Sequence, residues 1–251
     1  MKENRENKYT ELCTMLRSMR LSGMAEKLTE QGNNPNIDLK TFDERISDII
    51  ESEWNMRNNK KFMRLLKKAH LRYPDASLDD TIYDPDRLLD VNAVQALIHS
   101  DWIAAGRNLL ITGKTGAGKS YYSNVIAISA LREFNTVRYY KARELIYQLE
   151  KARLEGTITE AINDLYKIDL LILDDFGLMD LDPDKCRYLF EAIDAREGRK
   201  SIVVVSQLPI ESWYSLFKDS TYAEACLDRL VCDAYRLEFN GRNMRNPNLQ
   251  H

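Results

Sequence analysis

The sequence has few of the residues that build disulfide frameworks or zinc sites. Its 251 residues include four cysteines and three histidines, and neither type recurs at the paired spacing of a metal-binding motif. No apolar run approaches the ~18–20 residues that a membrane-spanning helix needs, and the charged N-terminus lacks a secretory pattern. We therefore expect a soluble, cytoplasmic protein with reduced cysteines and no membrane partner.

The chain also lacks a strong net positive charge. Its formal net charge is −3, yet residues 1–75 hold 15 Lys and Arg against 12 Asp and Glu. A local basic surface in this part of the chain is therefore a better candidate for nucleic-acid binding than the protein as a whole.

The first part of the chain is predicted to be helical. Helical spacing of apolar residues extends over 8–72, interrupted by the Gly-, Asn- and Pro-containing cluster 32–36. Thr41 and Glu44 form a capping-box pattern at the start of one helix. We predict a small helical N-terminal domain over 1–75.

From about Val91 the pattern changes to helices that alternate with short, β-branched strands. This alternation is typical of a parallel sheet covered by helices on both faces. The strands are expected at 108–112, 136–140, 169–173, 201–205 and 235–239. We therefore predict a second domain of the α/β class over 76–251.

The segment 113–120, Gly-Lys-Thr-Gly-Ala-Gly-Lys-Ser, fits the phosphate-loop pattern at every fixed position. A buried strand is predicted before it and a helix after it, so main-chain N–H groups and the helix dipole would favour bound phosphate. Lys119 would reach the β- and γ-phosphates, and the Ser120 hydroxyl would ligate Mg²⁺. The pattern predicts a nucleoside triphosphate site. The predicted nucleotide-binding residues are Gly113, Thr115, Gly116, Ala117, Gly118, Lys119, Ser120 and Tyr121.

Two carboxylates, Asp174 and Asp175, follow the predicted strand 169–173. We expect this strand to lie next to the strand that enters the phosphate loop. Asp174 would then hold Mg²⁺ through water, and Asp175 would orient or deprotonate an attacking water. The alternative is that both acids only cap the turn that follows the strand.

Three further residues are candidates for sensing the nucleotide or completing the site. Gln207 follows the predicted strand 201–205 and would hydrogen-bond the γ-phosphate or the water, although an ordinary glutamine at the end of a strand fits the pattern equally well. Arg229 would serve as an arginine finger in a neighbouring subunit, or else form a surface ion pair. Arg245 is the better candidate for a phosphate sensor near the C-terminus, with Arg242 as the alternative.

A basic segment over 57–72 suggests contact with nucleic acid. It contains seven cations and no acidic residue, and five of the cations recur at spacings of three and four, as on one helical face. Such a row suits sequence-independent binding to the phosphates of double-stranded DNA, with the solvated helix face as the plainer explanation. The predicted DNA-binding residues are Arg57, Lys60, Lys61, Arg64, Lys67, Lys68 and Arg72.

The order of these motifs resembles that of AAA+ ATPases of the IstB/DnaC group, and most closely the IstB-type transposition helper proteins of insertion sequences. The resemblance covers nearly the whole chain. It is carried by the phosphate loop, by Leu173–Gly177, Ser206–Trp213, Leu227–Leu230 and Gly241–Arg245, and in the N-terminal part by 16–26, 51–53 and 64–69.

The resemblance implies an AAA+ core with little or no lid domain, which binds ATP and Mg²⁺, forms homo-oligomers on DNA and stimulates a cognate transposase. Asp175 stands where many relatives have Glu, and Gln207 stands where close relatives usually have Asn. Both departures favour slow hydrolysis used as an assembly switch. A DnaC-like helicase loader is the alternative function, and a small-molecule kinase is disfavoured because no acceptor-binding lid is evident.

Overall fold

The computed structural model of the chain describes residues 2–80, 91–179, 181–240 and 244. Two compact units are present, Met1–Arg64 and Leu65–His251. Their boundary lies within one helix, and the domain boundary predicted at 75/76 remains a prediction. Among the described residues, no helix is both long and apolar enough to cross a membrane.

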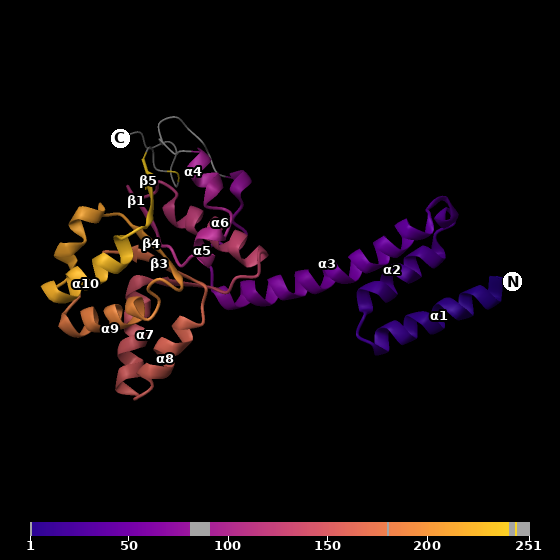
Figure 1. The fold of residues 1–251 in the computed structure, drawn as a ribbon, viewed down its shortest axis with the longest axis horizontal. Coiled ribbons are helices and arrows are strands. Elements are labelled where there is room, and N and C mark those ends of the chain that lie inside the picture. The colour runs from indigo at the N-terminus through magenta and orange to yellow at the C-terminus, as the bar shows by residue number, and fades with distance from the viewer. Residues whose placement is uncertain (1, 81–90, 180, 241–243, 245–251) are drawn as a thin grey trace. The chain divides into compact units, whose positions relative to one another are not determined.

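The N-terminal unit is built from α1 (Lys2–Ser18), α2 (Ser22–Asn33) and the first part of α3 (Phe42–Ala69) (Figure 1). The capping box at the start of α3 is confirmed: the Thr41 amide donates to Glu44 Oε2 at 2.7 Å, and the Glu44 amide donates to Thr41 Oγ1 at 3.3 Å. These two reciprocal bonds satisfy N–H groups that the first helical turn leaves unpaired.

A buried glutamate joins α2 to α3 within the N-terminal unit. Glu53 Oε2 accepts the amide of Gly23 at 2.8 Å and that of Met24 at 3.3 Å, at the start of α2. A Cβ on Gly23 would lie 2.9 Å from the Cα of Glu53, so only glycine permits this approach. Arg57 donates to the other oxygen, Oε1, at 2.6 Å and completes the partners of the carboxylate.

The second unit contains the predicted parallel sheet (Figure 1). Its strands are β1 (Leu109–Gly113), β2 (Val137–Lys141), β3 (Leu170–Phe176), β4 (Ser201–Ser206) and β5 (Tyr235–Phe239). They are all parallel, in the spatial order β2-β3-β4-β1-β5. The fold-class prediction is confirmed, and each strand lies close to its predicted range.

Helices cover the sheet. The helices of this unit, in addition to the end of α3, are α4 (Val91–Ala96), α5 (Asp101–Ala104), α6 (Lys119–Arg132), α7 (Ala142–Leu154), α8 (Ile158–Tyr166), α9 (Pro183–Asp194) and α10 (Ser220–Val231). Alternate strand residues such as Leu171, Leu173 and Val204 form one core cluster with buried residues of α7, α9 and α10. The helix α6 contacts β1, β3 and β4 and is almost entirely buried.

The sheet order corrects one expectation about the site. We predicted that the strand carrying Asp174 would lie beside the strand that enters the phosphate loop. Instead β4 lies between β3 and β1. Asp174 therefore faces the loop across the end of an intervening strand, and the polar end of β4 becomes part of the same site.

A glycine is required where β1 meets β5. Gly113 pairs with Phe239 in the parallel register and has φ +133°, and a Cβ at this position would lie 2.0 Å from the carbonyl oxygen of Phe239. Any side chain there would force the two strands apart. The first glycine of the phosphate loop thus also allows β5 to pack against the loop.

Candidate nucleotide-binding site

The phosphate loop connects β1 to the N-terminus of α6. Gly118 has φ +94° and precedes Lys119, the first residue of the helix. Although it is a lysine, Lys119 is only 6% exposed, and its Nζ donates to the carbonyl oxygens of Gly113 at 2.6 Å and Lys114 at 2.8 Å. The ammonium group of Lys119 is therefore hydrogen-bonded to the phosphate loop itself. It lies next to the N-terminus of α6, where phosphate binding is favoured.

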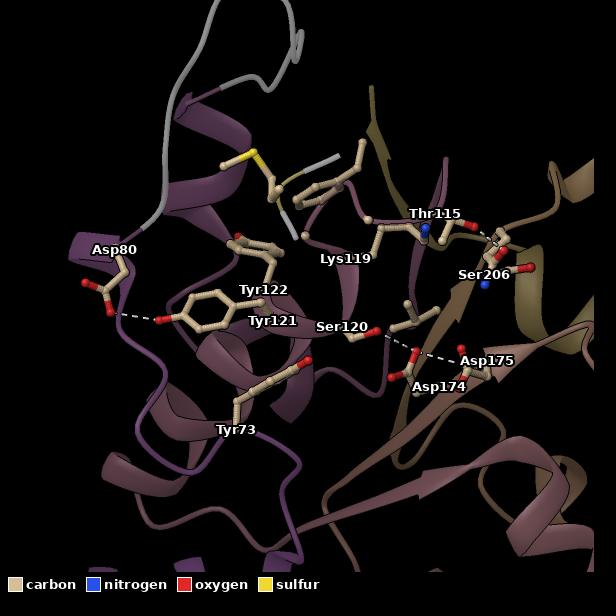
Figure 2. Close-up of a pocket in the computed structure, with 16 residues that line it drawn as sticks. Tyr73, Asp80, Thr115, Lys119, Ser120, Tyr121, Tyr122, Asp174, Asp175 and Ser206 are labelled. Carbon is tan, nitrogen blue, oxygen red and sulfur yellow. Dashed lines mark hydrogen bonds between the residues drawn. The ribbon is translucent and has the colours of Figure 1, made fainter. Parts of the chain in front are cut away.

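The Asp174 side chain is directed at the start of α6 (Figure 2). It is 1% exposed, and its Oδ1 accepts the Ser120 hydroxyl at 3.1 Å and the Asp175 amide at 2.8 Å. Its Oδ2 accepts the hydroxyl of Tyr139, on β2, at 2.5 Å. Burial first, and then the adjacent carboxylate, raise the pKa of Tyr139, so this phenol remains a donor.

The Ser120 hydroxyl and the Asp174 carboxylate provide the oxygen ligands that Mg²⁺ prefers. Their oxygens are already brought together by one hydrogen bond, so the residues present fit a magnesium ion.

Asp175 belongs to β3 itself and not to a turn after the strand. Its φ is +56°, a left-handed value that is uncommon for residues other than glycine. The pairing of β3 with β4 shifts register between Leu173 and Phe176. Asp174 and Asp175 both line the same pocket. The local distortion of β3 allows these two consecutive acids to contribute to one site.

Gln207 follows β4 and contacts the phosphate loop. Its Oε1 accepts the hydroxyl of Thr115 at 2.5 Å, and Ser206, the preceding residue, donates to the carbonyl oxygen of Phe176 at 2.7 Å. The end of β4 is thereby hydrogen-bonded to the loop on one side and to β3 on the other.

These polar groups line one end of a pocket of about 450 Å³ whose other end is aromatic (Figure 2). Tyr73 and Tyr121 have ring centroids 5.7 Å apart, and the Tyr121 hydroxyl donates to Asp80 Oδ2 at 2.8 Å. Aromatic faces suit a planar base, and the phosphate loop suits the triphosphate attached to it. The remaining lining residues include Tyr122, Phe239 and Met244.

Sequence reasoning missed most of this aromatic end. Tyr73, Asp80 and Phe239 belong to no motif that would connect them to residues 113–120. Their proximity arises from the tertiary fold, and the Met244 amide, which donates to the Gly116 carbonyl oxygen at 2.9 Å, is a further example. Tyr121 directly follows the phosphate loop, and Met244 lies in the segment Gly241–Arg245 that carries the family resemblance.

Arg229 lies near the end of α10, as predicted, and is held by its own chain. Its guanidinium forms ion pairs with Asp194 at 2.8 Å and Glu197 at 3.0 Å and lies over the ring of Phe190. Arg229 is not one of the described residues that line the pocket. Arg245 and Arg242 lie outside the described residues.

Six of the seven cations predicted to bind DNA are exposed residues of α3. They are Arg57, Lys60, Lys61, Arg64, Lys67 and Lys68. Arg57 forms an ion pair with the buried Glu53.

The prediction that Arg72 lies on the same helical face as the other cations was wrong. The helix ends at Ala69, and His70 adopts φ +52°, so Arg72 does not continue the helical row. Its Nη1 lies 3.8 Å from Asp174 Oδ2, at the pocket.

Residues 14–251 match the family of IstB-like ATP binding proteins. A protein of Sinorhizobium fredii, named as an insertion sequence ATP-binding protein, is 37% identical over 231 residues, which are 92% of this chain and 93% of that protein. A Pseudomonas fluorescens protein named as the ATP-binding protein of insertion sequence IS1162 is 37% identical over 196 residues, 78% of this chain and 85% of that protein.

Two solved structures share the fold of about two thirds of this chain. The DnaC helicase loader has a TM-score of 0.56 at 18% identity, covering 67% of this chain and 99% of that chain. DnaA of Aquifex aeolicus bound to AMPPCP has a TM-score of 0.56 at 19% identity, covering 68% and 52%. At such identities these likenesses establish the fold alone.

Proposed function

Because the chain belongs to the family of IstB-like ATP binding proteins, we propose that it is a magnesium-dependent ATPase that binds DNA and assists the transposase of an insertion sequence. The observation that carries this proposal is the convergence, in one pocket, of the phosphate loop, the paired acids of β3 and the polar end of β4. A base fits the aromatic end and a triphosphate fits the loop.

Five polar residues of the pocket have a proposed role. Lys119 and the loop amides bind the β- and γ-phosphates, while Ser120 and Asp174 hold Mg²⁺, which when bound neutralises charge on the phosphate oxygens. Asp175 orients an attacking water and accepts its proton. Gln207, already bonded to Thr115, responds to the presence of the γ-phosphate. Hydrolysis is slow and acts as a switch, because the carboxylate of Asp175 is one methylene shorter than that of glutamate.

The oligomer and DNA parts of the proposal depend on different surfaces. Arg229 of one subunit would complete the site of its neighbour, so that ATP favours the assembled state and hydrolysis releases it. The exposed cations of α3 would bind DNA phosphates without reading sequence, because positive charge alone carries no base specificity.

Insertion-sequence relatives favour a transposase as partner over a replicative helicase. The relatives with insertion-sequence names reach 37% identity, whereas the helicase loader, at 18%, shares the fold alone. Affinity capture with the full-length protein and ATP distinguishes the two: recovery of a helicase in place of a transposase would reverse this choice.

Calorimetric titration with ATP at saturating Mg²⁺ tests the foundation of the proposal. The wild-type protein should bind ATP, and Lys119→Ala should lose binding because the buried ammonium group of the loop is removed. Lys114→Ala is the matched control, since its exposed side chain belongs to the same loop and only its carbonyl oxygen contacts Lys119. Absence of binding by the folded wild-type protein would refute the proposed function.

A further inference from the structure

The carboxylate of Asp174 has a cationic partner that the AAA+ motifs do not include. Arg72 Nη1 lies 3.8 Å from Asp174 Oδ2, the oxygen that also accepts the Tyr139 hydroxyl. The other oxygen, Oδ1, faces Ser120. One buried carboxylate is therefore shared between a guanidinium on one side and the proposed magnesium position on the other.

The segment that carries Arg72 is anchored beside the phosphate loop. The Tyr73 amide donates to Asn124 Oδ1 at 3.1 Å, and Asn124 Nδ2 donates to the carbonyl oxygen of Ser120 at 2.6 Å. The Arg72 guanidinium lies over the Tyr73 ring, 5.3 Å from its centroid. These contacts hold Arg72 near Asp174 although its side chain remains 34% exposed.

We propose that Arg72 is a positioning residue that competes with Mg²⁺ for Asp174 and so sets the magnesium concentration at which nucleotide is held. This inference rests on the proposed function of the pocket. The guanidinium stabilises the carboxylate before a metal arrives. When Mg²⁺ binds at Ser120 and Asp174, two cations share one buried anion and repel each other.

The coupling acts in both directions. If Arg72 weakens magnesium binding, magnesium must weaken the interaction between Arg72 and Asp174 by the same factor, because linkage between two binding equilibria is reciprocal. Arrival of the metal would thus loosen the segment that follows α3, which ends at Ala69. Arg72 therefore reports metal occupancy to a segment outside the phosphate loop.

The test is a magnesium titration of nucleotide binding, monitored by the fluorescence of an ATP analogue at fixed concentration. Arg72→Gln removes the charge and should lower the half-saturating Mg²⁺ concentration about fivefold or more, the range of ordinary coupling between sites. Arg72→Lys keeps the positive charge and should stay within about twofold of wild type, because the repulsion depends on charge. Binding in excess EDTA should be the same for all three proteins. Arg132→Gln, an exposed arginine of α6, controls for general loss of positive charge.

Each other outcome overturns the inference. An unchanged or higher magnesium requirement in Arg72→Gln would exclude competition. An equal loss of affinity with Mg²⁺ and with EDTA would make Arg72 a phosphate-binding or structural residue. If wild type fails to bind nucleotide at any magnesium concentration, the proposed function fails as well, whereas normal wild-type binding with no effect of Arg72→Gln refutes only the competition.

Discussion

The hydroxyl of Thr115 donates a hydrogen bond to Gln207 Oε1, which joins the phosphate loop to the end of β4. Thr115 and Gln207 are 92 residues apart in the sequence. The hydrogen bond between them forms because β4 lies beside β1 in the sheet. A γ-phosphate bound in the loop would lie where either side chain can respond to it. The proposed sensing role of Gln207 therefore has a physical route that does not require movement of the sheet.

Replacing Asp175 by Asn should separate ATP binding from hydrolysis. The variant should bind ATP with unchanged affinity and hydrolyse it at least about 100-fold more slowly, because an amide cannot accept the proton of the attacking water. Asn tolerates left-handed φ values, so the backbone at +56° is preserved. Phosphate release and calorimetry measure the two properties. Asp164→Asn, on an exposed carboxylate, is the control, and normal hydrolysis by Asp175→Asn would exclude the proposed role.

Replacing Arg229 should block ATP hydrolysis, and mixing the variant with a second variant should restore part of this activity. Arg229→Ala should bind ATP but hydrolyse it poorly, and a mixture with Lys119→Ala should recover part of the activity because intact fingers then meet intact pockets.

The ion pairs of Arg229 require their own control. Asp194→Asn combined with Glu197→Gln removes both partners and leaves the arginine in place. If this double variant loses as much activity as Arg229→Ala, and mixing recovers none, then Arg229 acts only within its own chain.

Neutralising the exposed cations of α3 should weaken DNA binding and reduce its dependence on salt. Changing Lys60, Lys61, Arg64, Lys67 and Lys68 to Gln should lower the slope of log affinity against log salt by about 0.9 for each DNA phosphate that the variant no longer neutralises. Fluorescence anisotropy with duplex DNA at several salt concentrations gives the slope, and ATP affinity should not change. Arg132→Gln with Arg199→Gln, both exposed, controls for loss of positive charge elsewhere on the surface. An unaltered slope in the α3 variant would remove this helix from the DNA-binding proposal.

The stability contributed by Glu53 should depend on pH. Burial opposes its ionisation, but Arg57 and the amides of Met24 and Gly23 outweigh this and lower the pKa of Glu53 below its usual 4.5. A lowered folded-state pKa stabilises the protein above the unfolded value, and this stability is lost as pH falls through the folded value.

Glu53→Gln should therefore reduce the free energy of unfolding by about 1.5–3 kcal/mol near pH 7, the range for charged hydrogen bonds. The difference from wild type should shrink below about pH 4.5. Urea unfolding at several pH values measures it. Glu30→Gln is the control, because the Glu30 side chain is 69% exposed. A difference that does not vary with pH would contradict this account.

Substitution of Gly113 should be more damaging than that of another glycine with positive φ. Gly113→Ala should destabilise the protein by more than the ~1–2 kcal/mol of a left-handed alanine, since its Cβ would meet the Phe239 carbonyl oxygen at 2.0 Å. Gly156→Ala is the matched control, with φ +74° and nothing within 4 Å of the added Cβ. Thermal unfolding of both variants gives the comparison, and equal losses would argue against the close approach.

The sequence predicted the strands well because buried parallel strands are continuous apolar runs. The segment 169–173, for example, corresponds to β3, although β3 continues through Asp174 and Asp175 to Phe176. The phosphate loop was equally easy to predict from the sequence, because its residues are contiguous and each fixed position of the pattern has its own chemical role in binding phosphate.

Relations between distant segments could not be predicted in this way. The position of β4 between β3 and β1 depends on how the connecting helices pack. No local sequence pattern predicts that packing. Arg72 was misplaced because helical spacing was extended beyond the point where His70 leaves the helical conformation. The aromatic end of the pocket likewise combines Tyr73 with Phe239, and only the tertiary fold brings them to one cavity.

The pairing of Gly113 with Phe239 has a consequence for biosynthesis. β1 lies inside the sheet only when β5 covers its outer edge, and of the strands that the structure describes, β5 is the last to leave the ribosome. The nascent chain therefore emerges with a phosphate loop whose supporting strand is still unpaired on one side. Competence to bind nucleotide should consequently arise late in translation, after Phe239 has been made.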